Sequence, residues 1–515
     1  MALFFCCWYF KGLPEYFPID DSYIILTYAR NVIECGELFS YNQGTLSTGI
    51  TSPLYCLSLV AANIFTGNLP DAVYFIGFIA FLVSLVAGSW WVWIISGEGR
   101  QGHIASILFS VFWGCWGYIH FFTFCGMEPI LYIALSFLAL CFYSKQKHFL
   151  TGLVLGLAAL CRPEAVFLAF LLGLPYVISF VSGLLKKDYK ETKNTVISGL
   201  KLLGGFFLLY GIWAARCLQV SGSIFSSTVA LKSGAEYFGL ENYARCFLTM
   251  LPVDAYDYNV MSTVLPDTPW MALRRWCPVS LLSLGCIFFC KGGITNYRAW
   301  LPVMYPLVHF AGTVLKNNVC NDNIRYHVLD FSIVMACMAV FIAWLITSPS
   351  VKNKVLFGFR NYAGVYLAAL LVGLVVNDHF YQKTMYSVMS SYFYALDYSI
   401  GKWLAANTPP GTAVAHFQAG GIKYFGNCRT IDLGAVTDHT VIPYLQGKNG
   451  LDLEDLLVAR RADYIAPMGE DWAEQHGIHI RDSRYYEPVF MHSRHLYKIN
   501  KAALREAVIK SNLGR

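Results

Sequence analysis

The sequence predicts a mostly α-helical protein in which a polytopic membrane module is followed by a small soluble α/β domain. Its 515 residues are 56% apolar and only 14% charged, and the mean hydropathy is +0.48, which is too apolar for an ordinary soluble globule. Apolar runs long enough to cross a bilayer core of about 30 Å recur along the first three quarters of the chain. From about residue 395, short mixed segments separated by Pro and Gly replace them.

The apolar runs are expected to be helices, because lipid offers no hydrogen-bond partner to an exposed backbone. The clear candidates for membrane spans are residues 72–95, 104–124, 165–184, 195–217, 327–347 and 361–377. Shorter candidates are residues 52–67, 129–143, 149–161, 277–290 and 299–315. Together these runs predict about ten to twelve spans.

Cationic loops predict the orientation, since loops rich in Lys and Arg stay on the cytoplasmic side. The most cationic loops are residues 145–148, 186–193, 291–298 and 351–360. With these inside, the outer side receives a first loop at about 14–50, a large loop at about 218–276, the loop 316–326 and everything after Asn377. The assignment requires that 52–67 does not cross completely. The alternative is a full crossing there, which places the loop 145–148 outside.

The two predicted domains are a membrane module over residues 1–394 and a soluble outer-face domain over residues 395–515. The stretch DYSIGKWLAANTPPGTAVAHF predicts an amphipathic helix, a Pro-Pro-Gly turn and a strand, and short strand and helix signals continue to HLYKIN. No N-x-[ST] sequon occurs in the chain. This favours a bacterial inner membrane, with the soluble domain facing the periplasm.

Several function classes are disfavoured by missing motifs. The sequence has no GxxxxGK[ST] phosphate loop, no HExxH, no GxSxG and no dinucleotide-binding GxGxxG. The 16 cysteines form neither CxxC pairs nor clusters with metal-ligand spacing. The net charge of +6 is too small and too dispersed for nucleic-acid binding.

On the predicted topology, the ionisable residues near the apolar runs gather on the outer side. Because such residues are costly at a membrane unless paired or solvated, a one-sided collection predicts a polar cavity. The members are Asp20, Asp21, Arg30, Glu128, Arg162, Glu164, Arg216, Lys232, Arg325 and His327.

Each group also has a purely structural interpretation. Asp20 and Asp21 suit a helix start, where the dipole favours carboxylates. Arg162 and Glu164 suit an ion pair at a turn between helices, and outward-facing cations often reach for water or headgroups. What favours function is the Gly, Ser and Thr rich stretch ELFSYNQGTLSTGITSPLY, which is suited to wrapping a small polar ligand. The cations Arg216, Lys232 and Arg325 suit one lipid phosphate.

The order of these motifs resembles the GT-C superfamily of membrane glycosyltransferases that use polyprenyl-phosphate sugars. Its branch of mycobacterial terminal arabinofuranosyltransferases and related bacterial envelope enzymes is the most similar. The resemblance is carried, in order, by DDSYIILTYARN, YNQG, TGITSPLY, CGMEPILY, CRPEAV, RCLQVSGSIFSSTVALKSG, IRYHVLD and the tail from KWLAANTPPG to IDLGAVTDHTV. The chain departs from the branch pattern at Cys125, at Ser227, and at His327 to Leu329, where a Pro is missing.

The resemblance implies a GT-C-like fold, inverting sugar transfer from a polyprenyl-phosphate donor to a glycan, glycolipid or protein acceptor, and contact with membrane lipids. One acid of the pair, with Asp21 slightly favoured, would be the general base. Relatives also suggest a divalent cation, Mg²⁺, Mn²⁺ or Ca²⁺, near Asp20 and Asp21, which the sequence does not require. The supporting or substrate-binding residues would be Arg30, Tyr23, Glu128, Arg162, Glu164, Thr51, Tyr326 and His327.

Two other classes stay open at this point. A transporter or flippase of lipid-linked sugars would use the same one-sided cations to hold phosphate, although the sequence shows no inverted repeat. A non-catalytic assembly protein would present the outer domain but would leave the outer acids without a task.

Overall fold

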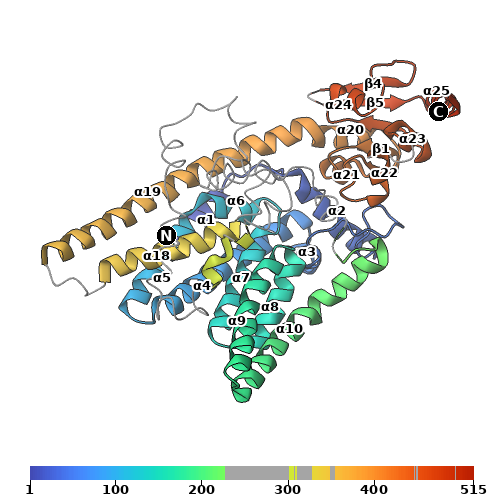
Figure 1. The fold of residues 1–515 in the computed structure, drawn as a ribbon. Coiled ribbons are helices and arrows are strands. Elements are labelled where there is room, and N and C mark those ends of the chain that lie inside the picture. Colours follow the sequence, from blue (N-terminus) through green and yellow to red (C-terminus); the bar gives the residue numbers. More distant parts are fainter. Residues whose placement is uncertain are drawn as a thin grey trace.

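The fold is a bundle of long apolar helices with a small α/β domain at one end (Figure 1). It is seen in a computed structural model, which describes residues 1–224, 226, 301–306, 308–309, 328–347, 354–445, 447, 451–492 and 494–514. The predicted span 277–290, the loop 316–326 and most of the large loop 218–276 lie outside these residues. The chain is a multi-pass membrane protein, since five described helices are long and apolar enough to cross a bilayer, or six if one bent pair is a single span.

The helical module follows the predicted order of elements. Its first half contains α1 (Ala2–Phe10), α2 (Asp20–Cys35), α3 (Pro53–Thr66), α4 (Leu69–Ser96), α5 (Arg100–Cys115), α6 (Gly117–Phe124), α7 (Pro129–Ser144), α8 (His148–Cys161), α9 (Ala165–Leu185) and α10 (Tyr189–Ser221). The described part continues with the short 3-10 helix Leu301–Met304, α18 (Val328–Thr347) and α19 (Lys354–Phe393).

Local sequence signals explain where these helices begin and end. Asn68 caps α4 by accepting a hydrogen bond from the backbone N–H of Asp71, and Gly97 ends α4 in the left-handed conformation at φ +99°. Asp188 caps α10 in the same way, through the N–H of Glu191. Glycine allows α8 and α10 to pack closely, because a Cβ at Gly152 would lie 1.9 Å from the carbonyl oxygen of Leu202.

The predicted span 104–124 is wrong as a single helix. α5 and α6 form a pair bent by 57° at Trp116, whose backbone is extended. The short span 52–67 is present as the 14-residue α3. At 1.5 Å per residue α3 is roughly 21 Å long, less than the bilayer core of about 30 Å. Its length therefore agrees with incomplete crossing.

The C-terminal α/β domain is built on a five-stranded mixed sheet in the order β2-β1-β3-β5-β4. Strand β1 pairs in parallel with β2 and β3, whereas β5 pairs antiparallel with β3 and β4. The strands are β1 (Ala413–His416), β2 (Arg429–Asp432), β3 (Tyr464–Ala466), β4 (Tyr486–Met491) and β5 (His495–Ile499). The helices are α20 (Ser399–Asn407), α21 (Gly421–Gly426), α22 (Ile442–Leu445), α23 (Leu453–Ala459), α24 (Glu470–Gln475) and α25 (Lys501–Gly514), with the 3-10 turn His439–Val441.

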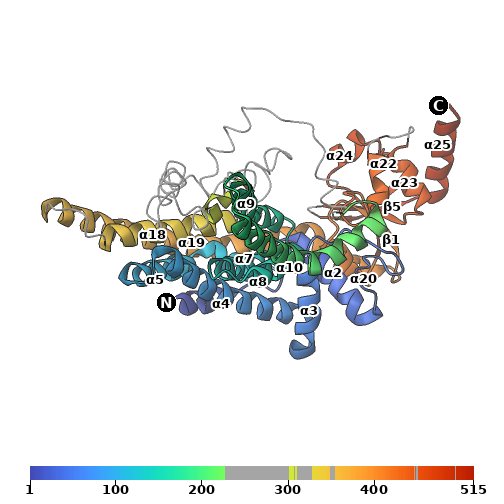
Figure 2. The same cartoon turned by 60° about the horizontal axis from the view of Figure 1, so that its bottom comes forward.

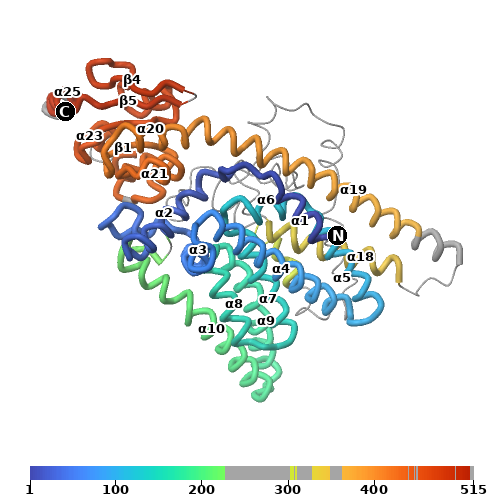
Figure 3. The backbone as a smooth tube through the Cα atoms, turned by 180° about the vertical axis from the view of Figure 1, so that it is seen from behind, coloured from blue at the N-terminus to red at the C-terminus, as the bar shows by residue number. Residues whose placement is uncertain are grey.

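The predicted boundary at 394/395 falls inside a helical stretch. α19 passes through a π-turn at Tyr394–Tyr398 directly into α20, so the longest apolar helix runs into the C-terminal domain without a loop. The domain lies against α2 and near the end of α10, as seen from two opposite sides (Figures 1 and 3) and in the tilted view (Figure 2). This junction contains the predicted acids.

Candidate functional site

The two acids at the start of α2 have different surroundings. Asp20 is buried, and its two carboxylate oxygens accept hydrogen bonds from the backbone N–H groups of Gly420 (2.8 Å) and Gly421 (2.7 Å) at the start of α21. Neither position has room for a side chain, because a Cβ at Gly420 would be 2.0 Å from the carbonyl oxygen of Asp20 and one at Gly421 would be 2.1 Å from the ring of Tyr398. Asp20 therefore holds the C-terminal domain against α2.

Burial raises the pKa of Asp20 from 3.8 to about 6, although the two amide hydrogen bonds act in the opposite direction. The charge of neighbouring Asp21 raises the pKa further, and that of Arg494 lowers it. The carboxyl of Asp20 thus titrates close to neutral pH because it sits inside the junction.

Asp21 is partly exposed. Successive residues of an α-helix point about 100° apart, so the side chain of Asp21 leaves α2 in a different direction from that of Asp20. Of the two acids, Asp21 is the more exposed to solvent.

The divalent cation suggested near Asp20 and Asp21 stays a prediction. Both oxygens of Asp20 already face N–H groups, and among the described residues no group of three or more His, Cys, Asp or Glu side chains converges on a metal-sized site.

Arg30 and Tyr23 also bind the C-terminal domain. The guanidinium of Arg30 donates to the carbonyl of Tyr424 at 2.8 Å and lies 4.9 Å from the centre of the Tyr424 ring. Tyr23 packs against Tyr398 and Phe425, and its hydroxyl accepts the N–H of Phe17. In the structure both residues act as docking contacts.

The first loop, expected to wrap a small ligand, binds the C-terminal domain through three of its polar side chains. Asn42 makes two hydrogen bonds to the backbone of Thr430 in β2, at 2.8 and 2.9 Å. The hydroxyl of Ser47 donates to the carbonyl of Thr437 at 2.8 Å, and that of Tyr41 donates to the carbonyl of Ala419. Thr51, just before α3, is partly buried.

A second group of charges surrounds Arg162. Its guanidinium donates to Glu128 at 2.6 Å and to Glu164 at 3.0 and 3.3 Å, and the side chains of Arg162 and Glu128 are each only 4% exposed. This confirms the ion pair between Arg162 and Glu164 and adds Glu128 from the preceding turn. We call these three residues the Arg162 cluster.

The Arg162 cluster lies next to polar groups that sequence reasoning missed. Tyr305 contacts the carbonyl of Glu164 at 3.5 Å and shares a hydrogen bond with Tyr132 at 2.8 Å. His309 stacks on Tyr305 and pairs with Asp330 at 2.9 Å. The sequence did contain a signal for this site, since His309 and Asp330 each stand inside an apolar run, where an ionisable residue is costly.

Ser22 links the acid pair to this cluster. Its hydroxyl donates to the carbonyl of Cys125 at 2.7 Å, and Gly126, at φ +85°, would place a Cβ only 2.8 Å from the Ser22 side chain. The start of α2 therefore packs on the turn that leads to Glu128. Ser22 thus connects the helix that carries Asp20 and Asp21 to the turn before Glu128, and the gathering of these residues on one outer side stays a prediction.

The three predicted phosphate-binding cations are only partly described. Arg216, near the end of α10, lies over the ring of Phe39 at 5.4 Å and contacts the carbonyl of Leu38 at 3.5 Å, so it supports the first loop. Lys232 and Arg325 lie outside the described residues, as do Tyr326 and His327.

A buried ion pair that the sequence did not indicate completes the junction. Arg494, in the turn between β4 and β5, donates to Asp397 at 2.5 Å, and Asp397 lies in the π-turn between α19 and α20. The partners are 97 residues apart, and no local pattern joins them.

Comparison with solved structures identifies the architecture. The Archaeoglobus fulgidus oligosaccharyltransferase, in a crystal structure with Zn and sulfate, is similar with a TM-score of 0.56 at 13% identity, covering 96% of this chain and 72% of that one. The chain has a GT-C-like fold. At this level of identity the likeness describes the fold and leaves the activity to be proposed.

Other comparisons gave lower TM-scores or matched only part of the chain. AglB from A. fulgidus, in complex with an inhibitory peptide and a dolichol-phosphate, gives a TM-score of 0.49 at 13% identity, covering 90% of this chain and 68% of that one. ArnT from Cupriavidus metallidurans, bound to undecaprenyl phosphate, gives 0.47 at 12%, covering 98% and 97%. A family model described as a domain of unknown function (DUF8728) matches residues 385–503. Comparison with curated proteins gives no match.

Proposed function

We propose that this chain is an integral membrane glycosyltransferase that transfers a sugar from a polyprenyl-phosphate donor to a hydroxyl of a glycan, glycolipid or protein acceptor. The proposal is supported by the ordered motif resemblance and by the fold shared with an oligosaccharyltransferase. The observation that carries it is the division between the two acids of α2. Asp20 is buried and bound to backbone amides, whereas Asp21 is partly exposed at the same helix start.

In the proposed reaction, Asp21 is the general base. Its carboxylate accepts the proton of the acceptor hydroxyl while the hydroxyl oxygen attacks the anomeric carbon. The bond between that carbon and the phosphate oxygen breaks, and the polyprenyl phosphate leaves with the electron pair. Attack opposite the leaving group inverts the anomeric centre.

The leaving phosphate requires nearby positive charge, because negative charge develops on its oxygen in the transition state. We assign this role to Lys232 and Arg325, together with Arg216 near the end of α10. Arg216 also holds the first loop through Leu38 and Phe39, so its removal is expected to affect both loop position and phosphate binding.

The finer assignment is a bacterial cell-envelope enzyme related to the mycobacterial terminal arabinofuranosyltransferases, with the site on the periplasmic side of the inner membrane. It rests on the order of the sequence motifs and on the cationic loops placed inside. The C-terminal domain, which binds the first loop, would shape access for the acceptor.

The test is a transfer assay with the purified full-length chain and a panel of synthetic polyprenyl-phosphate sugars, arabinofuranose included. We expect a new glycosidic bond and stoichiometric release of polyprenyl phosphate from one donor. Asp21→Asn should abolish both, and Asp71→Asn, an exposed acid in the first turn of α4, is the matched control.

A flippase would give another result in the same experiment. Donor would cross the membrane of reconstituted vesicles without release of polyprenyl phosphate, and Asp21→Asn would not change that movement. This outcome would contradict the transferase proposal.

A further inference from the structure

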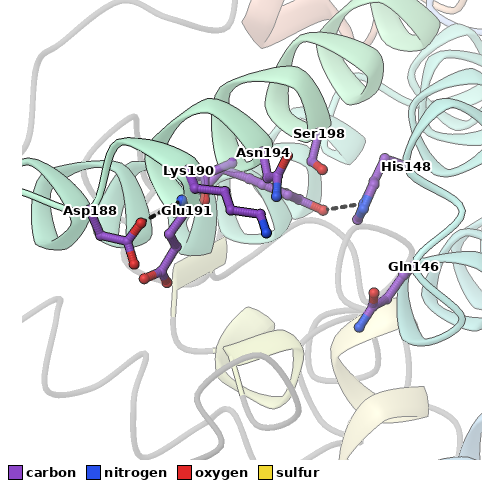
Figure 4. Close-up of a pocket in the computed structure, with 9 residues that line it drawn as sticks. Gln146, His148, Asp188, Lys190, Glu191, Asn194 and Ser198 are labelled. Carbon is purple, nitrogen blue, oxygen red and sulfur yellow. Dashed lines mark hydrogen bonds between the residues drawn. The ribbon is translucent and has the colours of Figure 1, made fainter.

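A polar pocket of about 410 Å³ lies at the far end of the bundle from the C-terminal domain, between the starts of α8 and α10 and the side of α9 (Figure 4). Its volume is within the range of ordinary ligand pockets, about 300–1,000 Å³. Lys190 and Arg216 are 26 residues apart on α10, which places the pocket roughly 40 Å from the first loop. The lining residues are Gln146, His148, Tyr176, Asp188, Lys190, Glu191, Asn194, Thr195 and Ser198.

The lining carries both signs of charge at separate places. Figure 4 shows Asp188 and Glu191 at one end of the pocket and Gln146 and His148 at the other, with the amine of Lys190 between them. The imidazole of His148 is held by a hydrogen bond to the Tyr176 hydroxyl at 2.6 Å. Within the described part of the chain, Lys190 takes part in no ion pair, so its ammonium is available to an anionic group.

The length of α10 bears on the depth of the pocket in a bilayer. α10 has 33 residues and is therefore roughly 50 Å long, so if it is centred on a hydrocarbon core of about 30 Å, each end projects roughly 10 Å beyond that core. From Asp188 to Ser198 the pocket covers roughly the first 15 Å of this helix. In that position it reaches from water to the edge of the hydrocarbon.

Apolar side chains are also exposed on the two helices α9 and α10 that help to line the pocket. Val177 follows Tyr176 on α9 and is 59% exposed, and Leu200, two residues after Ser198 on α10, is 62% exposed. A ligand with a headgroup in the pocket could place acyl chains against this surface.

From this arrangement we propose that the pocket binds the headgroup of an aminophospholipid of the phosphatidylethanolamine class in the cytoplasmic leaflet. Lys190 binds the phosphate, Asp188 and Glu191 bind the primary ammonium, and the acyl chains lie along α9 and α10. A primary ammonium has three N–H donors for carboxylates, which the trimethylated choline headgroup lacks. The proposal is independent of the transfer reaction proposed above.

Native mass spectrometry of the full chain in detergent tests this proposal, with phosphatidylethanolamine, phosphatidylcholine and phosphatidylglycerol added at equal concentration. We expect phosphatidylethanolamine to be retained about tenfold more than the other two, the effect of one charge-assisted hydrogen bond. Lys190→Ala should lower its retention by about tenfold. Glu191→Gln should remove the preference over phosphatidylcholine. Lys193→Ala, an exposed cation outside the lining, should change nothing.

Three outcomes would overturn the assignment. The first is equal retention of the three lipids by the wild-type chain. The second is an equal effect of Lys190→Ala and Lys193→Ala, which would indicate a general attraction between cations and phosphate. The third is full competition by soluble glycerophosphoethanolamine at the concentration of the lipid, which would identify a free phosphoester as the ligand.

Discussion

The junction at Asp20 and the Arg162 cluster both bury charge, but they compensate it differently. At the junction, a carboxylate from α2 is compensated by two backbone N–H groups of the C-terminal domain. In the Arg162 cluster, one guanidinium lies between two carboxylates of the membrane module. The first arrangement joins two domains, whereas the second holds helices of one module together.

This difference changes how the acid pair is understood. An adjacent pair of acids at a helix start suggests one site with two interchangeable members. The structure instead gives Asp20 a partner in the region matched by DUF8728, residues 385–503, and leaves Asp21 partly exposed. The pair therefore has one structural and one proposed catalytic member.

The largest expected effect on stability is at Arg162. Arg162→Ala leaves Glu128 and Glu164 buried without their cation, which typically costs about 3–5 kcal/mol of unfolding free energy. The measurement is the unfolding midpoint of the purified protein in detergent. Adding Glu128→Gln to this variant should recover part of the loss, because one uncompensated charge is removed.

Arg484→Ala is the matched control for that experiment. Arg484 also pairs with a carboxylate, that of Asp482 at 2.5 Å, but it is 74% exposed, so its loss should leave the unfolding midpoint unchanged. An equal drop in the Arg162 and Arg484 variants would contradict the burial argument.

The next largest expected effect is a dependence of the unfolding free energy on pH, which arises from the titration of Asp20. Because burial raises its folded-state pKa from 3.8 to about 6, its contribution to stability is complete below about pH 3.8 and is lost as pH rises through about 6. A shift of this size corresponds to about 3 kcal/mol. Unfolding midpoints between pH 4 and pH 8 would show this slope.

Asp20→Asn isolates that contribution. Burial also raises the pKa of Asp432 to about 6, with the same sign, so the wild-type slope has at least two sources. The difference between wild type and Asp20→Asn should therefore decrease as pH rises. Parallel profiles would mean that Asp20 does not titrate in this range.

The smallest effect is expected at the first loop. Asn42→Ala removes two hydrogen bonds to Thr430, which together contribute about 1–3 kcal/mol. Limited proteolysis should then cut the first loop faster than in wild type. Gln43→Ala, at the exposed neighbouring position, serves as control, and equal cutting in both variants would remove the docking role of Asn42.

Much of this architecture follows from the sequence because its signals are local. Apolar runs and helix-capping residues predicted most of the described helices. The change of composition near residue 395 predicted the α/β domain. The bend at Trp116 was missed, since residues 104–124 form one mostly apolar run, and the contacts that α5 and α6 each make with α19 join residues far apart in the sequence.

The candidate site was only partly predictable, because its contacts join distant residues. The predicted membrane topology placed Asp20, Asp21, Glu128 and Arg162 on the same outer side, since each follows or precedes an apolar run. The partners of Asp20 are 400 and 401 residues away, and Gly420 and Gly421 contribute only backbone amides, which no side-chain pattern reveals. The contacts of Arg30 and the first loop with the C-terminal domain were not predicted because they too join distant residues through backbone groups.

The most direct test of the different roles of the two acids compares Asp20→Asn and Asp21→Asn in two assays. These measure the unfolding midpoint and single-turnover transfer from a polyprenyl-phosphate sugar. We expect Asp21→Asn to keep the wild-type midpoint and to lose about 10²–10⁴-fold in transfer rate, the usual contribution of a general base. Asp20→Asn should change the midpoint and retain more transfer than Asp21→Asn once the folded fraction is taken into account. A wild-type transfer rate in Asp21→Asn would contradict the proposal that Asp21 is the general base.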